Sequence, residues 1–287
     1  MATRSRPSGG RPATGRQGKT PRSGRSSDLM ARILVAIPLA FIAVIFIDLG
    51  GWPFALFMTA VAWGAMHELY RMLHRWRPVA VVGFASATVM TLLARHGAQR
   101  DVLEVCVATI PLLFVAVMLR GQGHGTVAMA GTLLGVVWIG FACAHAVLLR
   151  GLPHGNGVVI DVLVGTFIGD TGAYIGGRLF GRRLLAPQIS PNKTWEGLFC
   201  GMLSAIVAVF LAGQFQAWLT QGDALILGVA VAVLGPLGDL FESLVKRDAG
   251  TKDTGNLFGP HGGVLDRADA ALFTLVAGYY VWFSVIH

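Results

Sequence analysis

Nine long apolar stretches divide this chain of 287 residues, and they constrain its fold more than any other feature. A helix of about 20 mostly apolar residues crosses a bilayer core, because a helix satisfies its own backbone hydrogen bonds there. The sequence therefore predicts an all-α, polytopic integral membrane protein with about nine transmembrane helices. The third stretch is the shortest and the eighth ends in a charged segment, so eight or ten spans remain alternatives. We place the spans at residues 30–49, 52–70, 79–95, 102–120, 126–149, 157–178, 196–219, 223–245 and 268–286.

The composition supports a membrane environment. Hydrophobic residues make up 54% of the chain and charged residues only 13%, whereas a typical soluble domain is about 25% charged. Burying so much apolar sequence in water would take a much longer chain. Cys106, Cys143 and Cys200 lie inside apolar runs without the spacing of a zinc site or a disulfide framework, so we expect small core residues.

Positive charge is concentrated at the start of the chain. Residues 1–28 carry seven Lys/Arg and one Asp, which accounts for +6 of the net charge of +8. This segment is rich in Ser, Gly, Pro and Arg and lacks aromatic residues, which predicts a disordered basic tail. A basic face interleaved with aromatic residues is missing from the sequence, so we expect no nucleic-acid partner. Residues 33–47 are interpreted as a retained first span rather than a signal peptide.

The distribution of basic residues predicts an orientation. If the tail is cytoplasmic, 20 Lys/Arg residues fall inside and only Arg95, Arg100 and Arg150 fall outside. Loops rich in Lys and Arg stay on the cytoplasmic side of a membrane. This split favours nine spans, a cytoplasmic N-terminus and an outward C-terminus.

Polar residues gather on the predicted cytoplasmic side, in residues 169–183, 190–197 and 238–269. Asp239, Glu242 and Lys246 share one helical face. A carboxylate at this depth is costly unless it is paired or binds a metal, so Asp239 is a functional candidate. An Asp239–Lys246 salt bridge or a solvated helix end is the structural alternative.

A glycine-rich loop follows in residues 259–263. Gly262 and Gly263 allow close backbone approach and present amide N–H groups, as an anion-binding nest requires. Asp266 and Asp269 lie one turn apart at the start of the ninth span, where helix capping is an alternative role for Asp269. Carboxylates and basic groups in one place suggest a divalent cation that holds a polyphosphate. Oxygen ligands favour Mg²⁺ over zinc.

Two further polar segments are expected to contribute to the same site. Ser190 and Pro191 indicate a helix start, with Ser190 as N-cap, and helix N-termini bind phosphate. Lys193 either adds a charge for a phosphate or marks the cytoplasmic boundary. Asp170 is either an acid that supports the metal's ligands or an interhelical hydrogen-bond partner.

Other features of the spans receive structural interpretations. Glycines four apart, at 165 and 169 and at 172 and 176, predict close packing of the sixth span. Glu68 is expected to pair with Arg71 near the interface. His145 is expected to be a hydrogen-bonded core histidine, and Asp161 to lie near the outer boundary.

The polar segments together form one extended motif over 27 residues. Its residues are Ser243-x-x-Lys246-Arg247, Lys252-Asp253 and His261-Gly262-Gly263-x-x-Asp266-Arg267-x-Asp269, joined upstream by Gly238-Asp239-Leu240-x-Glu242 and by residues 190–197. This motif resembles the signature of the phosphatidate cytidylyltransferase family, also called CDP-diacylglycerol synthases, and fills every fixed position of it. Members of that family convert CTP and phosphatidic acid to CDP-diacylglycerol and pyrophosphate in phospholipid biosynthesis.

The resemblance implies roles for individual residues. It implies Mg²⁺ held by Asp239 and Asp266, and it leaves open a monovalent cation such as K⁺. The expected partners are CTP, phosphatidic acid and the lipid bilayer, with a homodimer left open. The catalytic residues would be Asp239, Asp266, Lys246 and Lys252, and the substrate-binding residues Lys193, Ser243, Arg247, His261, Gly262, Gly263 and Arg267.

The apolar stretches, the distribution of basic residues and the resemblance together predict an organisation and a location. We expect a cytoplasmic tail at residues 1–28, N-terminal transmembrane helices at 29–156 and a C-terminal transmembrane catalytic region at 157–287. The protein would be a multi-pass protein of the cell inner (plasma) membrane with its active site on the cytoplasmic side.

Two alternative functions remain. A CTP-dependent kinase of a lipid alcohol would transfer a γ-phosphoryl group, and a transporter would also carry polar breaks in its spans.

Overall fold

The computed structural model describes residues 38–121, 123–251, 254–255 and 262–283. From Leu39 onward the chain belongs to one compact unit. The tail predicted for residues 1–28 lies outside the described residues, and so do Lys252 and His261.

Helices make up almost all of the described structure, which confirms the all-α class. Within the described residues, each of the nine predicted stretches overlaps one helical rod, because an apolar run of this length can be located from hydropathy alone. Residues 30–37 of the first stretch and 284–286 of the last lie outside the described residues. One rod, Gly125–Gly151, contains a π-helical segment at Val136–Gly140 between α5 and α6. The helices are Pro38–Leu49, α2 (Gly51–Met72), α3 (Ala80–Ala94), α4 (Gln99–Arg120), α5 (Gly125–Gly135), α6 (Phe141–Gly151), α7 (Gly155–Phe180), α8 (Trp195–Gly213), α9 (Gln221–Asp248) and α10 (Leu265–Val281), with a 3₁₀ turn at His74–Trp76.

Five of the described helical rods are long and apolar enough to cross a membrane by length and composition. The helix Pro38–Leu49 and α3 are apolar but shorter. A multi-pass membrane protein is therefore indicated, and the number of nine crossings stays a prediction. The five are Gln99–Arg120, Gly125–Gly151, Gly155–Phe180, Trp195–Gly213 and Gln221–Asp248.

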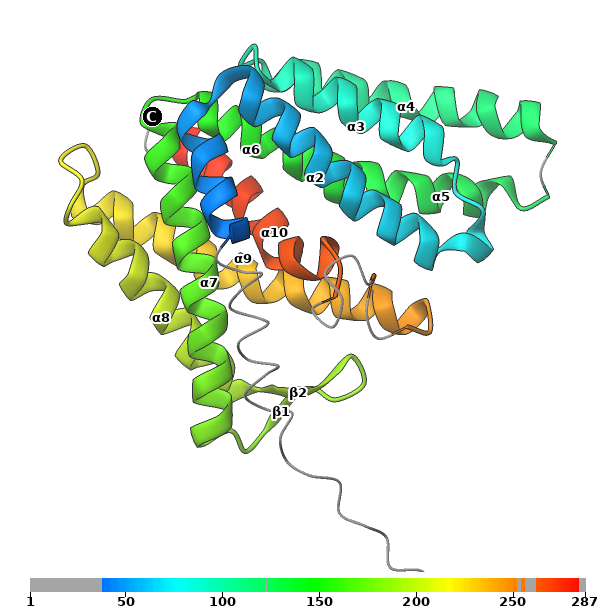
Figure 1. The fold of residues 1–287 in the computed structure, drawn as a ribbon. Coiled ribbons are helices and arrows are strands. Elements are labelled where there is room, and N and C mark those ends of the chain that lie inside the picture. Colours follow the sequence, from blue (N-terminus) through cyan, green and yellow to red (C-terminus); the bar gives the residue numbers. More distant parts are fainter. Residues whose placement is uncertain (1–37, 122, 252–253, 256–261, 284–287) are drawn as a thin grey trace, which may run out of the picture. The chain divides into compact units, whose positions relative to one another are not determined.

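Helix α10 connects the two groups of helices that make up the compact unit (Figure 1). Helices α7, α8 and α9 pack against one another, and α10 packs on α9 and α7. On its other side α10 contacts α6 and α2, which belong to the N-terminal group. The start of α10, where the signature aspartates lie, is therefore within reach of both groups.

A stripe of small residues brings α7 and α8 together, as the glycine spacing predicted. A Cβ atom added to Gly169 would lie 3.1 Å from the Ala205 Cβ, and one added to Gly201 would lie 2.8 Å from the Gly169 carbonyl oxygen. The two backbones are too close for larger side chains. This close pairing confirms the structural interpretation of the glycines.

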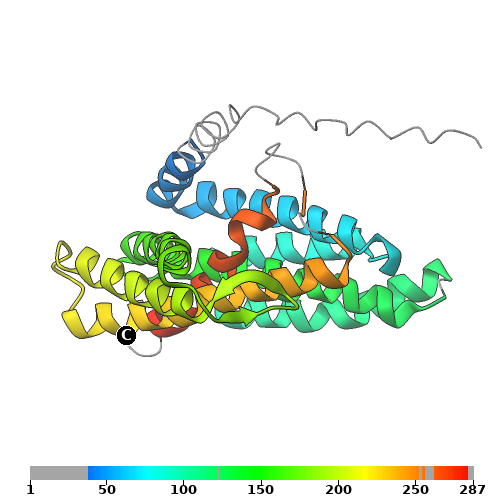
Figure 2. The ribbon, with the colours of Figure 1, turned by 90° about the horizontal axis from the view of Figure 1, so that it is seen from below.

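The segment after α7 is a hairpin rather than a helix start. Strands β1 (Leu184–Ala186) and β2 (Ser190–Thr194) pair in antiparallel fashion, and β2 contacts α9 (Figure 2). The predicted N-cap at Ser190 is therefore wrong. Pro191 lacks an N–H and suits a two-stranded edge, while the true cap of α8 is Thr194, whose hydroxyl oxygen accepts a hydrogen bond from the Gly197 amide at 3.1 Å.

Cys143 and His145 are core residues as expected, whereas Cys106 and Cys200 are half-buried. All three cysteines are free, and Cys143 is fully buried. His145 is buried, and its Nδ1 lies 2.9 Å from the Phe141 carbonyl oxygen one turn earlier on the same helix.

Candidate active site

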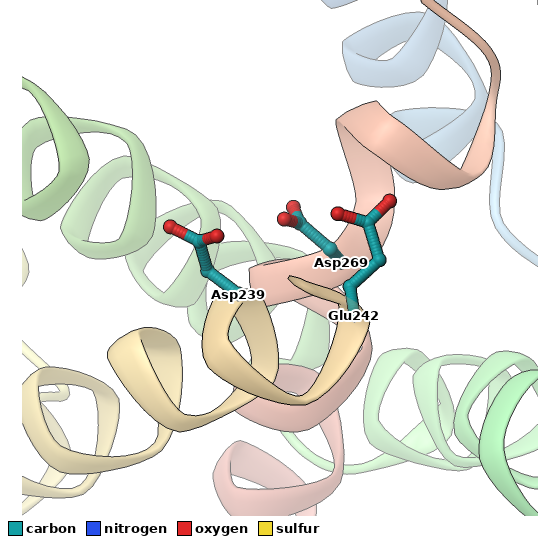
Figure 3. Close-up of side chains that lie close together, drawn as sticks. All are labelled: Asp239, Glu242 and Asp269. Atoms are coloured by element: carbon teal, nitrogen blue, oxygen red, sulfur yellow. The ribbon is translucent and has the colours of Figure 1, made fainter. Parts of the chain in front are cut away.

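Three carboxylates from two helices meet at the centre of the site. Asp239 and Glu242 lie one turn apart on α9, and Asp269 comes from α10; an oxygen atom of each lies within 4.8 Å of the others. Figure 3 shows the three side chains on the same side of the two helices. Gly238 permits this approach, because a Cβ atom there would lie only 2.6 Å from the Asp269 carbonyl oxygen.

These carboxylates fit a divalent cation. Glu242 is 1% exposed, and its Oε1 atom is buried without a hydrogen-bond donor among the described residues. An unpaired carboxylate oxygen is costly at such a position unless a cation or a proton meets it. A set of oxygen donors without Cys or His matches the preference of Mg²⁺. From the sequence, Asp269 could either cap the helix or belong to the functional site. The structure places its carboxylate in this acidic cluster.

Two lysines partly neutralise the acidic cluster. Lys246 Nζ lies 2.5 Å from Glu242 Oε2 and 3.0 Å from Asp266 Oδ1. Lys193, carried by the β hairpin, places its Nζ 2.6 Å from Asp239 Oδ2. The alternative of an Asp239–Lys246 salt bridge is therefore wrong, because the hairpin supplies Asp239 with a different cation.

Asp266 points into the loop that precedes α10. Its Oδ2 accepts hydrogen bonds from the Gly263 amide at 2.8 Å, the Thr254 amide at 3.1 Å and the Thr254 hydroxyl at 2.7 Å. Its Oδ1 faces Lys246. The group of three mutually close carboxylates does not include it. The Gly263 amide, predicted to bind an anion, thus already donates to a carboxylate of the chain.

A cavity of about 460 Å³ lies beside the acidic cluster, between α7, α8, α9 and β2. Asp170 and Arg178 of α7 line the same cavity as Lys193 and Asp239, so four charged groups lie in its wall. Small and apolar residues such as Gly165, Ala205 and Val231 form other parts of the lining. Such a wall suits a ligand with both a charged and an apolar part.

The remaining predicted site residues are distributed around this centre. Ser243 is half-buried on α9, next to Glu242. Arg247 is exposed, and its Nε donates to the Ile189 carbonyl oxygen at 3.1 Å, which ties α9 to the hairpin. Arg267 is exposed on α10. Gly262 has a φ of +79°, a left-handed conformation that favours glycine.

The sequence interpretation missed a carboxylate from the N-terminal helices. The expected pairing of Glu68 with Arg71 is wrong, because Glu68 accepts hydrogen bonds from the amides of Val264 and Leu265 at the start of α10, each at 2.9 Å. An isolated carboxylate in an apolar helix was a signal for this role. Arg71 lies only three residues later in the sequence, so the sequence favoured it as the partner of Glu68 over the distant start of α10.

Comparison with known proteins agrees with the geometry. The model of a family described as "Cytidylyltransferase family" matches residues 30–285. A phosphatidate cytidylyltransferase of Brucella suis is 31% identical over 254 residues, 85% of this chain and 89% of that protein. One from Mycobacterium bovis is 32% identical over 202 residues, 70% of this chain and 63% of that protein.

A phosphatidate cytidylyltransferase of Haemophilus influenzae is 40% identical over 138 residues, which is 46% of this chain. The match spans 48% of that protein, about half its length. The family model, in contrast, covers almost all of the spans and the complete acidic cluster. The chain therefore belongs to the cytidylyltransferase family.

Proposed function

We propose that this protein is a CTP:phosphatidate cytidylyltransferase that makes CDP-diacylglycerol and pyrophosphate from CTP and phosphatidic acid. One observation carries the proposal. In a member of the cytidylyltransferase family, the Asp239–Glu242–Asp269 cluster lies beside a cavity with apolar lining, and the wall of that cavity includes Asp239 and Lys193. A lipid phosphate needs both charged and apolar surface, and the phosphates of CTP need the charged groups.

The proposed reaction is a single in-line displacement. A phosphate oxygen of phosphatidic acid forms a bond with the α-phosphorus of CTP, and the bond between that phosphorus and the oxygen bridging to the β-phosphorus breaks. Pyrophosphate leaves with the electron pair of that bond. A covalent enzyme intermediate is unnecessary, so catalysis depends on positioning and on charge neutralisation.

Mg²⁺ is the metal that we propose for this site. Asp239, Glu242 and Asp269 would hold it, since their oxygens lie together and Glu242 Oε1 has no donor among the described residues. The bound ion would neutralise charge on the triphosphate oxygens. Asp266, implied as a ligand by the family resemblance, is proposed to act from the first turn of α10, where it accepts hydrogen bonds from Lys246 and from two backbone amides of the preceding segment. A monovalent cation such as K⁺ remains part of the proposal.

The chain's basic residues would bind the two substrates. Lys193 and Lys246 flank the acidic cluster and offer ammonium groups for phosphate oxygens. Lipid would reach the site from the inner leaflet and CTP from the cytoplasm, so we propose a location in the cell inner membrane with the site facing the cytoplasm. A homodimer is compatible with this arrangement. The other proposed substrate contacts are Ser243, Arg247, Lys252, His261, Gly262, Gly263 and Arg267.

An assay with two differently labelled nucleotides tests the function. Purified protein in detergent micelles receives phosphatidic acid, Mg²⁺ and CTP labelled on either the α- or the γ-phosphorus. We expect α-label in the lipid phase, and none from γ-labelled CTP. Asp239→Asn should abolish the transfer while the protein remains folded. Glu104→Gln, the removal of a surface charge on α4, is the matched control and should retain activity.

Two other results would contradict the proposal. γ-Label in lipid, with a lipid alcohol as acceptor, would indicate a kinase. Folded protein that transfers neither label, yet carries substrate into proteoliposomes, would indicate a transporter.

A further inference from the structure

Glu68 reaches from α2 into the loop that carries the signature residues. The side chain is 5% exposed and belongs to the N-terminal group of helices. Its Oε1 accepts the Val264 amide at 2.9 Å, and its Oε2 accepts the Leu265 amide at 2.9 Å and lies 3.1 Å from the Thr254 hydroxyl. One carboxylate therefore joins the described segment 254–255 to the start of α10.

Glu68 and Asp266 together accept three consecutive amides where the chain enters α10. A helix leaves the N–H groups of its first turn without internal partners. Asp266 accepts the Gly263 amide, whereas Glu68 accepts those of Val264 and Leu265. The Thr254 hydroxyl lies within 3.1 Å of both carboxylates and has a single proton to donate. The two carboxylates thus act on one shared network.

The backbone around Glu68 is shaped to receive its carboxylate. A Cβ atom on Gly255 would lie 2.7 Å from Glu68 Oε1, and one on Gly263 would collide with the same carboxylate. A longer side chain at either glycine would displace Glu68 from the amides. The close approach of Glu68 is therefore one physical reason for glycine at position 263.

We propose that Glu68 is a positioning residue for nucleotidyl transfer. Its carboxylate fixes the start of α10 and so sets where Asp269 stands relative to Asp239 and Glu242. The proposal rests on the proposed function and adds a residue from the N-terminal helices to the reaction. A misplacement of about 1 Å in such a site can cost about 100-fold in rate.

Variants of Glu68 test the proposal by activity and by metal binding. Glu68→Gln keeps the size of the side chain but turns an NH₂ group toward amide donors. We expect it to lower kcat about 10- to 100-fold and to raise the Mg²⁺ concentration for half-maximal activity about 10-fold, per folded molecule. Glu68→Asp keeps the charge on a shorter side chain, so it should recover part of both losses.

A second readout does not depend on turnover. We expect Mg²⁺ to raise the melting temperature of the wild-type protein in detergent, and Glu68→Gln to need about 10-fold more Mg²⁺ for the same rise. If Glu68→Gln fails to fold, the Mg²⁺ dependence of the melting temperature is measured on Glu68→Asp instead. Asp161→Asn is the control, since Asp161 is a carboxylate with 1% exposure whose partner is Gln216, away from the loop. It should leave turnover and the Mg²⁺ response unchanged.

The outcomes separate the two proposals. Lower melting temperatures with wild-type turnover and Mg²⁺ response would show a merely structural cap and overturn the positioning role. Absence of α-label transfer by the wild-type protein would overturn the proposed function and with it the role of Glu68 in that reaction, whereas the melting experiment would still test whether Glu68 positions the metal-binding carboxylates. A wild-type protein whose melting temperature ignores Mg²⁺ would overturn the metal-positioning role.

Discussion

At the scale of single residues, the contacts of Asp269 favour a role as a metal ligand over a role as a helix cap. Its carboxylate lies with Asp239 and Glu242, whereas the amides at the start of α10 are taken by Glu68 and Asp266. We expect Asp269→Asn to raise the Mg²⁺ concentration for half-maximal activity by at least about 10-fold, because one charged oxygen ligand is lost. Titration of activity with Mg²⁺ measures this change.

Asp101→Asn, in the first turn of α4, is the matched control for Asp269→Asn and should keep the wild-type Mg²⁺ requirement. If Asp269→Asn melts at a lower temperature but requires no more Mg²⁺, capping is its role. Asp269 would then leave the proposed ligand set.

At the scale of elements, the contact between α7 and α8 depends on Gly201. A Cβ atom there would lie 2.8 Å from the Gly169 carbonyl oxygen and 2.7 Å from the Ala173 Cβ. Because backbone cannot move aside as a flexible side chain does, we expect Gly201→Ala to destabilise the protein by about 1–3 kcal/mol. The measurement is the melting temperature in detergent.

The control for Gly201→Ala is Gly222→Ala in the first turn of α9. An added Cβ atom there meets only the Thr220 hydroxyl oxygen, at 3.9 Å. Alanine in a helix is favoured over glycine by about 0.5–1 kcal/mol, so this variant should be unchanged or more stable. Equal melting temperatures for Gly201→Ala and wild type would disprove the tight contact.

At the scale of the whole molecule, one labelling experiment tests both whether α3 crosses the membrane and which way the protein is oriented. His96 and Trp76 are exposed beyond opposite ends of α3. The excess of Lys and Arg on one side predicts that position 96 is outside and position 76 is cytoplasmic. In a variant without the three native cysteines, His96→Cys should react with a membrane-impermeant thiol reagent in intact cells. Trp76→Cys should react only after permeabilisation, and the reverse pattern would overturn the predicted orientation.

The positions of the helices followed from the sequence because hydropathy is a local property. Each apolar stretch must form its backbone hydrogen bonds internally in a bilayer, so the run itself specifies a helix. The glycine spacing in α7 was equally local, and its packing role is confirmed by Gly169 and Gly201. The hairpin at Ser190–Thr194 was missed because Ser-Pro also suits a helix start, and the pairing strand β1 decides between them.

The sequence by itself determined which residues are polar in an apolar chain, and hence Asp239, Lys246 and Asp266 as members of one site. It did not determine their partners. Sequence spacing reveals only neighbours one or two turns away on the same helix, which paired Glu68 with Arg71 and Asp239 with Lys246. In the tertiary structure Asp239 forms an ion pair with Lys193 of the hairpin, and Glu68 accepts hydrogen bonds at the start of α10. Helix packing decides which groups distant in sequence meet. A buried carboxylate takes the donors and cations that packing brings within reach.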